Sequence, residues 1–183
     1  MDDKAALQRL LDRQAIQDCL LRYTRGVDRL DRELLISAYH ADAIDDHGAF
    51  VGSPAAFADW ALPHHREHQS CTYHLILNHS CELDRDSAHG ETYCVYVGVN
   101  RNGTIDLIGN RYLDRLERRE GNWAILRRVC VVEWASSLPG AAQLEPNMRA
   151  AVAALMAGSG ASRDPGDISY RRPLDITKPR TDR

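Results

Sequence analysis

Two hydrophobic periodicities divide the chain into a helical beginning and a strand-rich middle. In three early segments, apolar side chains recur at the spacing of one face of a helix. These segments are residues 4–25, 29–39 and 54–68. Ser53 and Pro54 form a typical helix start. The serine side chain can accept a hydrogen bond from a free backbone amide of the first turn, and proline has no amide hydrogen that would need an acceptor there. A strand over residues 43–51 is predicted between the second and third helices.

Strand-like runs separated by short turns follow the third predicted helix. The runs cover residues 71–83, 88–100, 104–118 and 122–134. Asn102-Gly103 is a strong hairpin signal, because both residues tolerate the backbone conformation of a tight turn. Short turns in succession imply an antiparallel meander, which strong twist would curl. The sequence therefore predicts an α+β fold, a cone-shaped α+β barrel with three N-terminal helices packed on a curled, mostly antiparallel sheet.

The C-terminal part of the chain has a different pattern. Pro139-Gly140 ends the last predicted strand, and residues 145–156 are predicted to form a helix before a tail rich in proline and arginine. We therefore expect a cone domain at residues 1–138 and a C-terminal helix and tail at residues 139–183. The tail is expected to be mobile, or to be ordered only against its own or a neighbouring subunit.

Composition narrows the class of protein. A chain of 183 residues with 44% hydrophobic residues is large enough for one domain with a substantial core. Its net charge of −3 gives no reason to expect a nucleic-acid partner, and no apolar run approaches the ~18 residues needed to span a membrane. Five cysteines without a Cys-x-x-Cys spacing fit reduced thiols. We therefore expect a cytoplasmic protein without nucleic-acid or membrane partners.

The strand over residues 71–78 carries the main candidate for chemistry. Alternation places Thr72, His74, Ile76 and Asn78 on one face, so the imidazole of His74 points into partly apolar surroundings. Asp28, between the first two predicted helices, is the candidate partner that would orient this ring. Together they would form a general base poised near neutral pH. Two plainer interpretations stay open: His74 as a hydrogen-bonded core histidine, and Asp28 as the N-cap of the second helix.

The remaining histidines give weak signals for a metal. His64 and His68 have the spacing of half a helical metal site, but the His-Glu-x-x-His pattern is missing and a solvated helix face explains them better. Asp45-Asp46-His47 contains ligand types of an oxygenase iron site at a spacing that matches no such motif. We therefore expect no metal and no cofactor.

Several short motifs, taken in order, resemble the SnoaL-like family of the nuclear-transport-factor-2-like superfamily. They are Ala15-Ile-Gln-Asp18, Gly26-Val-Asp28, Tyr73-His74, the run from Gly109 to Trp123, and Arg127-Arg128. The resemblance covers about residues 8–135 and is strongest to the family's cofactor-free lyases: hexachlorocyclohexane dehydrochlorinase, bile acid 7α-dehydratase and scytalone dehydratase. It implies that Asp28 and His74 form the family's Asp–His base.

The same resemblance implies helpers around that base. Tyr23 matches a position that holds lysine in the dehydrochlorinase and tyrosine in the dehydratases, and Arg128 matches a pocket arginine of the dehydrochlorinase. Tyr23 could instead be a core aromatic, and Arg128 a surface charge, since only one of two successive strand residues points inward. Substrate contacts are expected from Asn110, Asn78 and Trp60. By contrast, Arg111 and Asp114 are expected to pin the strands through ion pairs.

These features predict a cofactor-independent lyase that eliminates water, with possible carbon–carbon cleavage, from a small apolar cyclic or aromatic substrate. The alternatives are a ketosteroid-type isomerase or polyketide cyclase, or a non-catalytic binding module like the small subunit of a ring-hydroxylating dioxygenase. Because one sheet face would stay apolar and uncovered, we expect a homo-oligomer, with a trimer favoured over a dimer.

Overall fold

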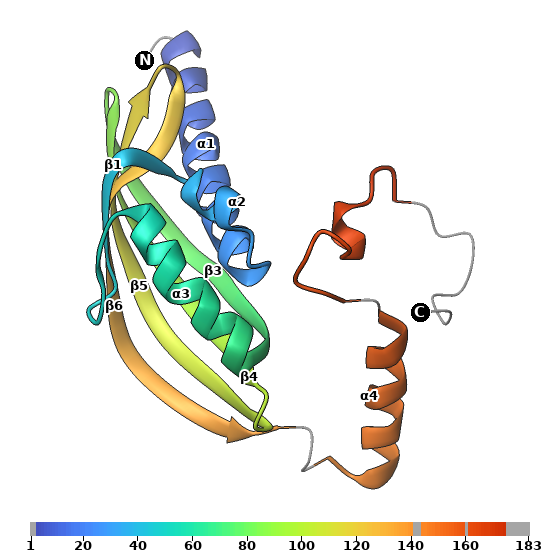
Figure 1. The fold of residues 1–183 in the computed structure, drawn as a ribbon. Helices are drawn as coiled ribbons and strands as arrows, with labels where there is room; N and C mark the ends of the chain where they lie inside the picture. Colours follow the sequence, from blue (N-terminus) through green and yellow to red (C-terminus); the bar gives the residue numbers. More distant parts are fainter. Residues whose placement is uncertain (1–2, 141–143, 160, 175–183) are drawn as a thin grey trace.

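The structure, a computed structural model, describes residues 3–140, 144–159 and 161–174, and Figure 1 shows its fold. The helices are α1 (Asp3–Asp28), α2 (Arg32–Ile36), α3 (Pro54–His68) and α4 (Pro146–Ser159), with a short 3-10 turn, η2 (Ile168–Tyr170). The strands are β1 (Tyr39–Asp46), β2 (Val51–Gly52), β3 (Gln69–Asp84), β4 (Ser87–Asn100), β5 (Thr104–Arg119) and β6 (Asn122–Pro139). The α+β class predicted from the sequence is confirmed.

The strands form one curled sheet in the order β2-β1-β6-β5-β4-β3. Its four long strands are an antiparallel meander, and β1 adds to β6 in parallel. Helices α1, α2 and α3 lie on the concave side of the sheet, as Figure 1 shows. The predicted cone of three N-terminal helices on a mostly antiparallel sheet is therefore present.

The segment between α1 and α3 differs most from the sequence prediction. A helix was expected over residues 29–39, but α2 is only five residues long. Leu30 adopts a positive φ of 54°, which interrupts the helix, and the Asp31 side chain then caps α2 at the Leu34 amide. Asp28 is consequently the last residue of α1, and the suggestion that it caps the second helix is wrong.

Strand β3 contains an irregularity that changes which residues face the helices. Its pairing with β4 shifts register between Ile76 and His79. Thr72 is buried and His74 lies on the same concave side, whereas Asn78, past Ile76, is exposed. The strict alternation used to group these residues therefore holds only up to the shift.

The core lies between the helices and the concave face of the sheet. Its fully buried apolar side chains include Ile16, Leu20, Leu35, Leu116 and Ile125. Gly26 permits a close contact between α1 and α2, because a Cβ atom at that position would lie 2.4 Å from the backbone nitrogen of Leu35. This contact fixes the end of α1 against α2.

The C-terminal segment returns to the helical side of the molecule after α4. Figure 1 shows α4 standing beside the sheet rather than on it, and Met148, Leu155 and Met156 are exposed. Residues 161–170 then contact the end of α1, where Arg29 pairs with Asp167 at 3.2 Å. The rest of the proline- and arginine-rich tail, from residue 175 onward, lies outside the described residues. Among the helices described, none is long and apolar enough to cross a membrane.

Candidate active site

A cavity of about 280 Å³ opens between the concave face of the sheet and helices α1 and α3. Aromatic and aliphatic side chains form most of its wall, and the polar groups are few. Its apolar lining includes Tyr23, Val27, Phe57, Trp60, Tyr96, Ile108 and Tyr112, and its polar lining includes His47, His64, His65, Gln69, His74 and Asn110. An apolar hollow with a few convergent polar groups is the usual form of a small-molecule site.

Asp28 and His74 meet at the wall of this cavity. Nδ1 of His74 lies 2.7 Å from Oδ1 of Asp28, and the backbone N–H of His74 donates to Oδ2 at 2.9 Å. Both side chains are largely buried. Since Asp28 engages Nδ1, Nε2 is the ring nitrogen left for a ligand, so the pair has the arrangement of an oriented general base.

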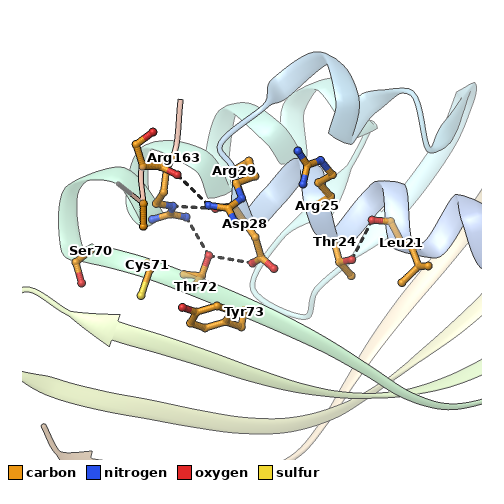
Figure 2. A pocket seen from close by; sticks show the side chains of 12 residues that line it. Leu21, Thr24, Arg25, Asp28, Arg29, Ser70, Cys71, Thr72, Tyr73 and Arg163 are labelled. Atoms are coloured by element: carbon orange, nitrogen blue, oxygen red, sulfur yellow. Dashed lines mark hydrogen bonds between the residues drawn. The ribbon is translucent and has the colours of Figure 1, made fainter. Parts of the chain in front are cut away.

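Further donors hold Asp28 in place. Thr72 donates from Oγ1 to the Asp28 carboxylate at 3.0 Å. Arg163, from the C-terminal segment, donates from Nη2 to Thr72 Oγ1 and from Nε to the backbone carbonyl of Asp28, both at 2.9 Å. Figure 2 shows Arg163 above Thr72 and Asp28. The C-terminal segment therefore holds Thr72 and the backbone of Asp28 in place.

Figure 2 views a second hollow of about 420 Å³, which Asp28 also lines. Arg25, Arg29 and Arg163 line it, but the imidazole of His74 does not. Arg29 is already paired with Asp167, and Arg25 donates to Ser169. The smaller aromatic cavity is therefore where a substrate would meet the imidazole.

Tyr23 stands beside His74 and is almost completely buried. Its ring centroid lies 6.4 Å from that of His74, and its hydroxyl lies 3.4 Å from Nε2 of His47. Burial raises the pKa of Tyr23 far above its usual value, partly opposed by the positive charge of Arg128. The hydroxyl therefore stays protonated and is available as a hydrogen-bond donor to oxygen.

Arg128 lies in the core and does not line the aromatic cavity. Its side chain and that of Asp114 are fully buried, with Nε 2.8 Å and Nη2 2.7 Å from the two carboxylate oxygens. Its guanidinium carbon lies 4.2 Å from the ring centroid of Tyr23 and 4.1 Å from that of Tyr112. Arg128 therefore points inward, as strand alternation requires of one of the two successive arginines. Its guanidinium group lies against aromatic rings and does not face the cavity.

Ion pairs between strands were predicted for Asp114 and Arg111, and both are confirmed. Asp114 on β5 pairs with Arg128 on β6. Arg111 on β5 donates to Glu91 on β4 and to Glu133 on β6, both at 2.7 Å.

The three expected substrate contacts lie in different environments. Asn110 is buried in the cavity wall, and its Nδ2 has no hydrogen-bond partner among the described residues. Trp60 lies at the cavity rim, about half exposed, and stacks on Phe50 with ring centroids 5.4 Å apart. Asn78 is exposed and does not line the cavity, because the register shift in β3 takes it off the concave face.

Several polar residues of the cavity wall, namely His47, His64, His65, Gln69 and Asp106, were not assigned to the site by the sequence analysis. Nδ1 of His47 contacts the carboxylate of Asp45, which also accepts from the hydroxyl of Tyr39. Burial lowers the pKa of His65 to about 4, and Nδ1 of this histidine lies 2.7 Å from the Gln69 side-chain oxygen. The spacing Asp45-x-His47 was the signal available for the first pair, because Asp45 lies in β1 and His47 directly follows that strand, where residues two apart can still share a face.

The metal-site interpretations receive no support from the geometry. The rings of His64 and His68 are tilted by 56° to each other, with centroids 4.7 Å apart, and both residues are exposed on α3. Within residues 3–140, 144–159 and 161–174, no three histidine, cysteine or acidic side chains gather as metal ligands would.

Comparisons with known proteins agree with this architecture. The profile of the SnoaL-like domain matches residues 8–129. No curated protein matches the sequence significantly. A hexachlorocyclohexane dehydrochlorinase of type 2 is similar in structure, with 26% identity and a TM-score of 0.69 over 77% of this chain and 98% of that one.

Other solved structures share the fold. A type 3 hexachlorocyclohexane dehydrochlorinase from Novosphingobium barchaimii has 24% identity and a TM-score of 0.64, covering 73% of this chain and 94% of its own. A candidate scytalone dehydratase from Novosphingobium aromaticivorans has 14% identity and a TM-score of 0.64, covering 75% and 97%. The profile match over most of the cone, together with the concave site described above, shows that this chain belongs to the SnoaL-like domain family.

Proposed function

We propose that this protein is a cofactor-independent lyase that eliminates water from a small apolar cyclic or aromatic substrate, with His74 as the general base. The hydrogen bond between His74 Nδ1 and Asp28, at the wall of an aromatic cavity, is the observation that carries the proposal. Its family membership and its structural likeness to dehydrochlorinases support a lyase-type role.

In the proposed reaction, Nε2 of His74 removes a proton from a carbon next to an electron-withdrawing group. The electron pair of that C–H bond forms a double bond as the neighbouring carbon–oxygen bond breaks. Asp28 stabilises the imidazolium that forms, as an orienting carboxylate does in a catalytic triad. Proton abstraction by a positioned base of this kind contributes about 100- to 10,000-fold in rate.

Tyr23 and Arg128 would assist at the leaving oxygen. The Tyr23 hydroxyl donates a hydrogen bond to that oxygen, and a tyrosine at this position favours an oxygen leaving group over chloride. Arg128 acts on the same group through Tyr23, because its fixed positive charge against the ring makes the buried hydroxyl a better donor. Arg128 is therefore a positioning residue in this proposal and does not touch the substrate.

The cavity limits the size and kind of substrate. A volume of about 280 Å³ with an aromatic lining fits a molecule of one or two rings. The unpartnered Asn110 Nδ2 would donate to a carbonyl or hydroxyl of the substrate, and Trp60 would cover its apolar part at the rim. Asn78 is not part of this proposal, since it faces away from the cavity.

We further propose that the protein acts as a homo-oligomer, with a trimer favoured. The convex face of the sheet, opposite His74, exposes a group of apolar side chains. They are Tyr73, Leu75, Tyr93, Leu113 and Val129. Contiguous apolar exposure on a sheet face is typical of a surface that another subunit covers.

The test is a screen of cyclic and aromatic β-hydroxy ketones in deuterated water with mass-spectrometric detection. We expect loss of water from at least one compound without added metal or cofactor. His74→Gln should reduce that turnover by about 100- to 10,000-fold while the circular dichroism spectrum is unchanged. His68→Gln, an exposed histidine outside the cavity, is the matched control and should retain wild-type activity.

The screen also separates the alternative functions. Deuterium uptake at carbon without loss of water would replace elimination by isomerase or cyclase chemistry. Binding without either change would indicate a non-catalytic module. Undiminished turnover by His74→Gln would remove the assigned base.

A further inference from the structure

A second histidine–carboxylate pair lies in the same cavity as Asp28 and His74. Asp45 is fully buried, and its carboxylate accepts hydrogen bonds from the Tyr39 hydroxyl and from Nδ1 of His47. His47 itself is partly buried and lines the cavity. A buried carboxylate of this kind fixes the ring proton on Nδ1 and stabilises positive charge on the imidazole when it forms.

The ring of His47 is also held by packing. It stacks on Phe57 of α3, with ring centroids 4.4 Å apart and an interplanar angle of 24°. Tyr112 of β5 lies 6.2 Å away, centroid to centroid. Because Nδ1 faces Asp45, Nε2 is the nitrogen directed toward Tyr23, whose hydroxyl is 3.4 Å away.

Tyr23 therefore stands between two imidazoles that belong to different elements. His74 comes from β3 and is oriented by the end of α1, whereas His47 follows β1 and is oriented from within that strand. Each ring turns Nδ1 to its own carboxylate and leaves Nε2 for the cavity or for Tyr23. A pair of oriented titratable groups around one substrate space is the arrangement that acid and base catalysis need.

We propose that His47 is the general acid of the reaction and that Asp45 is its positioning residue. This inference rests on the proposed elimination at His74. Nε2–H of protonated His47 gives its proton to the leaving oxygen, directly or through the Tyr23 hydroxyl, as the carbon–oxygen bond breaks. His74 takes the carbon-bound proton, so the products are an alkene and water or an alcohol.

The protons balance over one cycle. After elimination His74 is protonated and His47 is neutral, the reverse of the starting state. A proton leaves His74 to solvent and another returns to His47, which restores both groups. No oxidant, reductant or metal takes part.

The decisive experiment compares two leaving groups on one scaffold. The probes are methyl ketones with a β-phenoxy or a β-(para-nitrophenoxy) substituent, which differ chiefly in the basicity of the oxygen that departs. The phenoxide needs a proton from the enzyme, whereas the para-nitrophenolate departs without one. We expect His47→Gln to lose about 100-fold in kcat/KM on the phenoxy ketone and less than about threefold on the nitrophenoxy ketone.

Matched variants distinguish a role of His47 as general acid from a purely structural role. His74→Gln should lose activity equally on both probes, because the base is needed whatever leaves. Asp45→Asn should show the selectivity of His47→Gln in weaker form, and His68→Gln should change neither probe. An equal loss on both ketones with His47→Gln would overturn the proposal, since a distorted cavity harms both reactions alike.

A binding measurement tests the role of His47 even if neither ketone is consumed, whereas the proposed elimination itself is tested by the screen of β-hydroxy ketones. Para-nitrophenol reports its own ionisation by absorbance, and it is the product that occupies the leaving-group position. We expect the wild-type protein to bind it as the anion, and His47→Gln to bind at least tenfold more weakly. Equal binding by both proteins, or no binding by the wild type, would show that His47 does not form a leaving-oxygen site.

Discussion

Replacing Asp114 by asparagine should destabilise the protein far more than removing an ion pair from the sheet's outer face. Asparagine keeps the shape of the side chain but removes its negative charge. Arg128 would then be a fully buried guanidinium without a counter-ion, since both side chains of the pair are 0% exposed. Burial alone would lower the pKa of Arg128, and the neighbouring Asp114 is the main reason that this pKa stands well above its usual value instead.

The expected loss in the free energy of unfolding follows from the contacts of Arg128. Breaking a buried pair by removing one partner typically costs about 3–5 kcal/mol. Two features reduce it here: the asparagine oxygen still accepts one hydrogen bond, and the Tyr23 and Tyr112 rings retain cation–π contact with the guanidinium. We therefore expect a loss near the lower figure, about 3 kcal/mol, out of the ~5–15 kcal/mol typical of a domain.

Urea unfolding followed by tryptophan fluorescence measures this loss. With a slope of about 1–3 kcal/mol per molar urea, the midpoint should fall by roughly 1–3 M. Adding Arg128→Met to Asp114→Asn should recover much of the stability, because no unpaired charge is then buried. Arg111→Gln, which breaks partly exposed pairs with Glu91 and Glu133, should cost no more than about 1 kcal/mol. If Asp114→Asn costs as little as Arg111→Gln, the account of Arg128 as a buried charge held by Asp114 is wrong.

Three further outcomes are expected from other parts of the molecule. Arg163→Gln removes the donor to Thr72 and the Asp28 carbonyl, so kcat in the elimination assay should fall by roughly tenfold with KM little changed. The pKa of His65 is about 4 in the fold but 6.5 ordinarily, so the unfolded state binds more protons between these values. Stability should therefore decrease as the pH is lowered from 6.5 to 4, by at most about 1.4 kcal/mol per pH unit, and the urea midpoint of His65→Gln should decrease less steeply over that range than that of the wild type. Leu75→Glu on the convex face should give a monomer by light scattering; an unchanged mass would place the subunit contact elsewhere.

The sequence predicted the parts of the fold where a local signal and the tertiary structure agree. Ser53 does cap α3, accepting from the Ala56 amide, and the four long strands begin and end within a few residues of their predicted limits. Strand alternation also placed His74 on the face that meets Asp28. These features depend on short-range chemistry and on a two-residue period, both of which are visible in a sequence.

Two errors arise where a backbone irregularity changes the period of the sequence pattern. Leu30 ends the helical path with a positive φ, which no strong propensity signals, so α2 is shorter than predicted. A register shift in β3 turns Asn78 away from the cavity. His47 was not assigned to the site because Asp45-Asp46-His47 was considered as a metal motif, whose spacing it does not match, whereas the structure pairs His47 with Asp45. Arg163 lies far along the chain, so its contact with Thr72 has no local signal.

The position of the base depends on a glycine two residues before Asp28. An exposed helix position gains about 1 kcal/mol when alanine replaces glycine, but at Gly26 the new Cβ would lie 2.4 Å from the backbone nitrogen of Leu35. Backbone atoms cannot rotate away, so α1 and α2 must separate at a cost of about 1–3 kcal/mol. Gly26→Ala should therefore lower the urea midpoint. Asp28 would shift with the helix end, and a displacement of about 1 Å costs roughly 100-fold in rate.

Gly90→Ala is the matched control for this prediction. A Cβ atom at Gly90 would meet its nearest neighbour, a Leu116 methyl group, at 3.4 Å, which is ordinary contact. This variant should retain both the wild-type midpoint and the elimination activity. A Gly26→Ala protein that is more stable than the wild type and equally active would show that the helix end does not need this close approach to hold Asp28 against His74. The packing of the end of α1 against α2 and the activity of the Asp28–His74 pair would then not depend on each other.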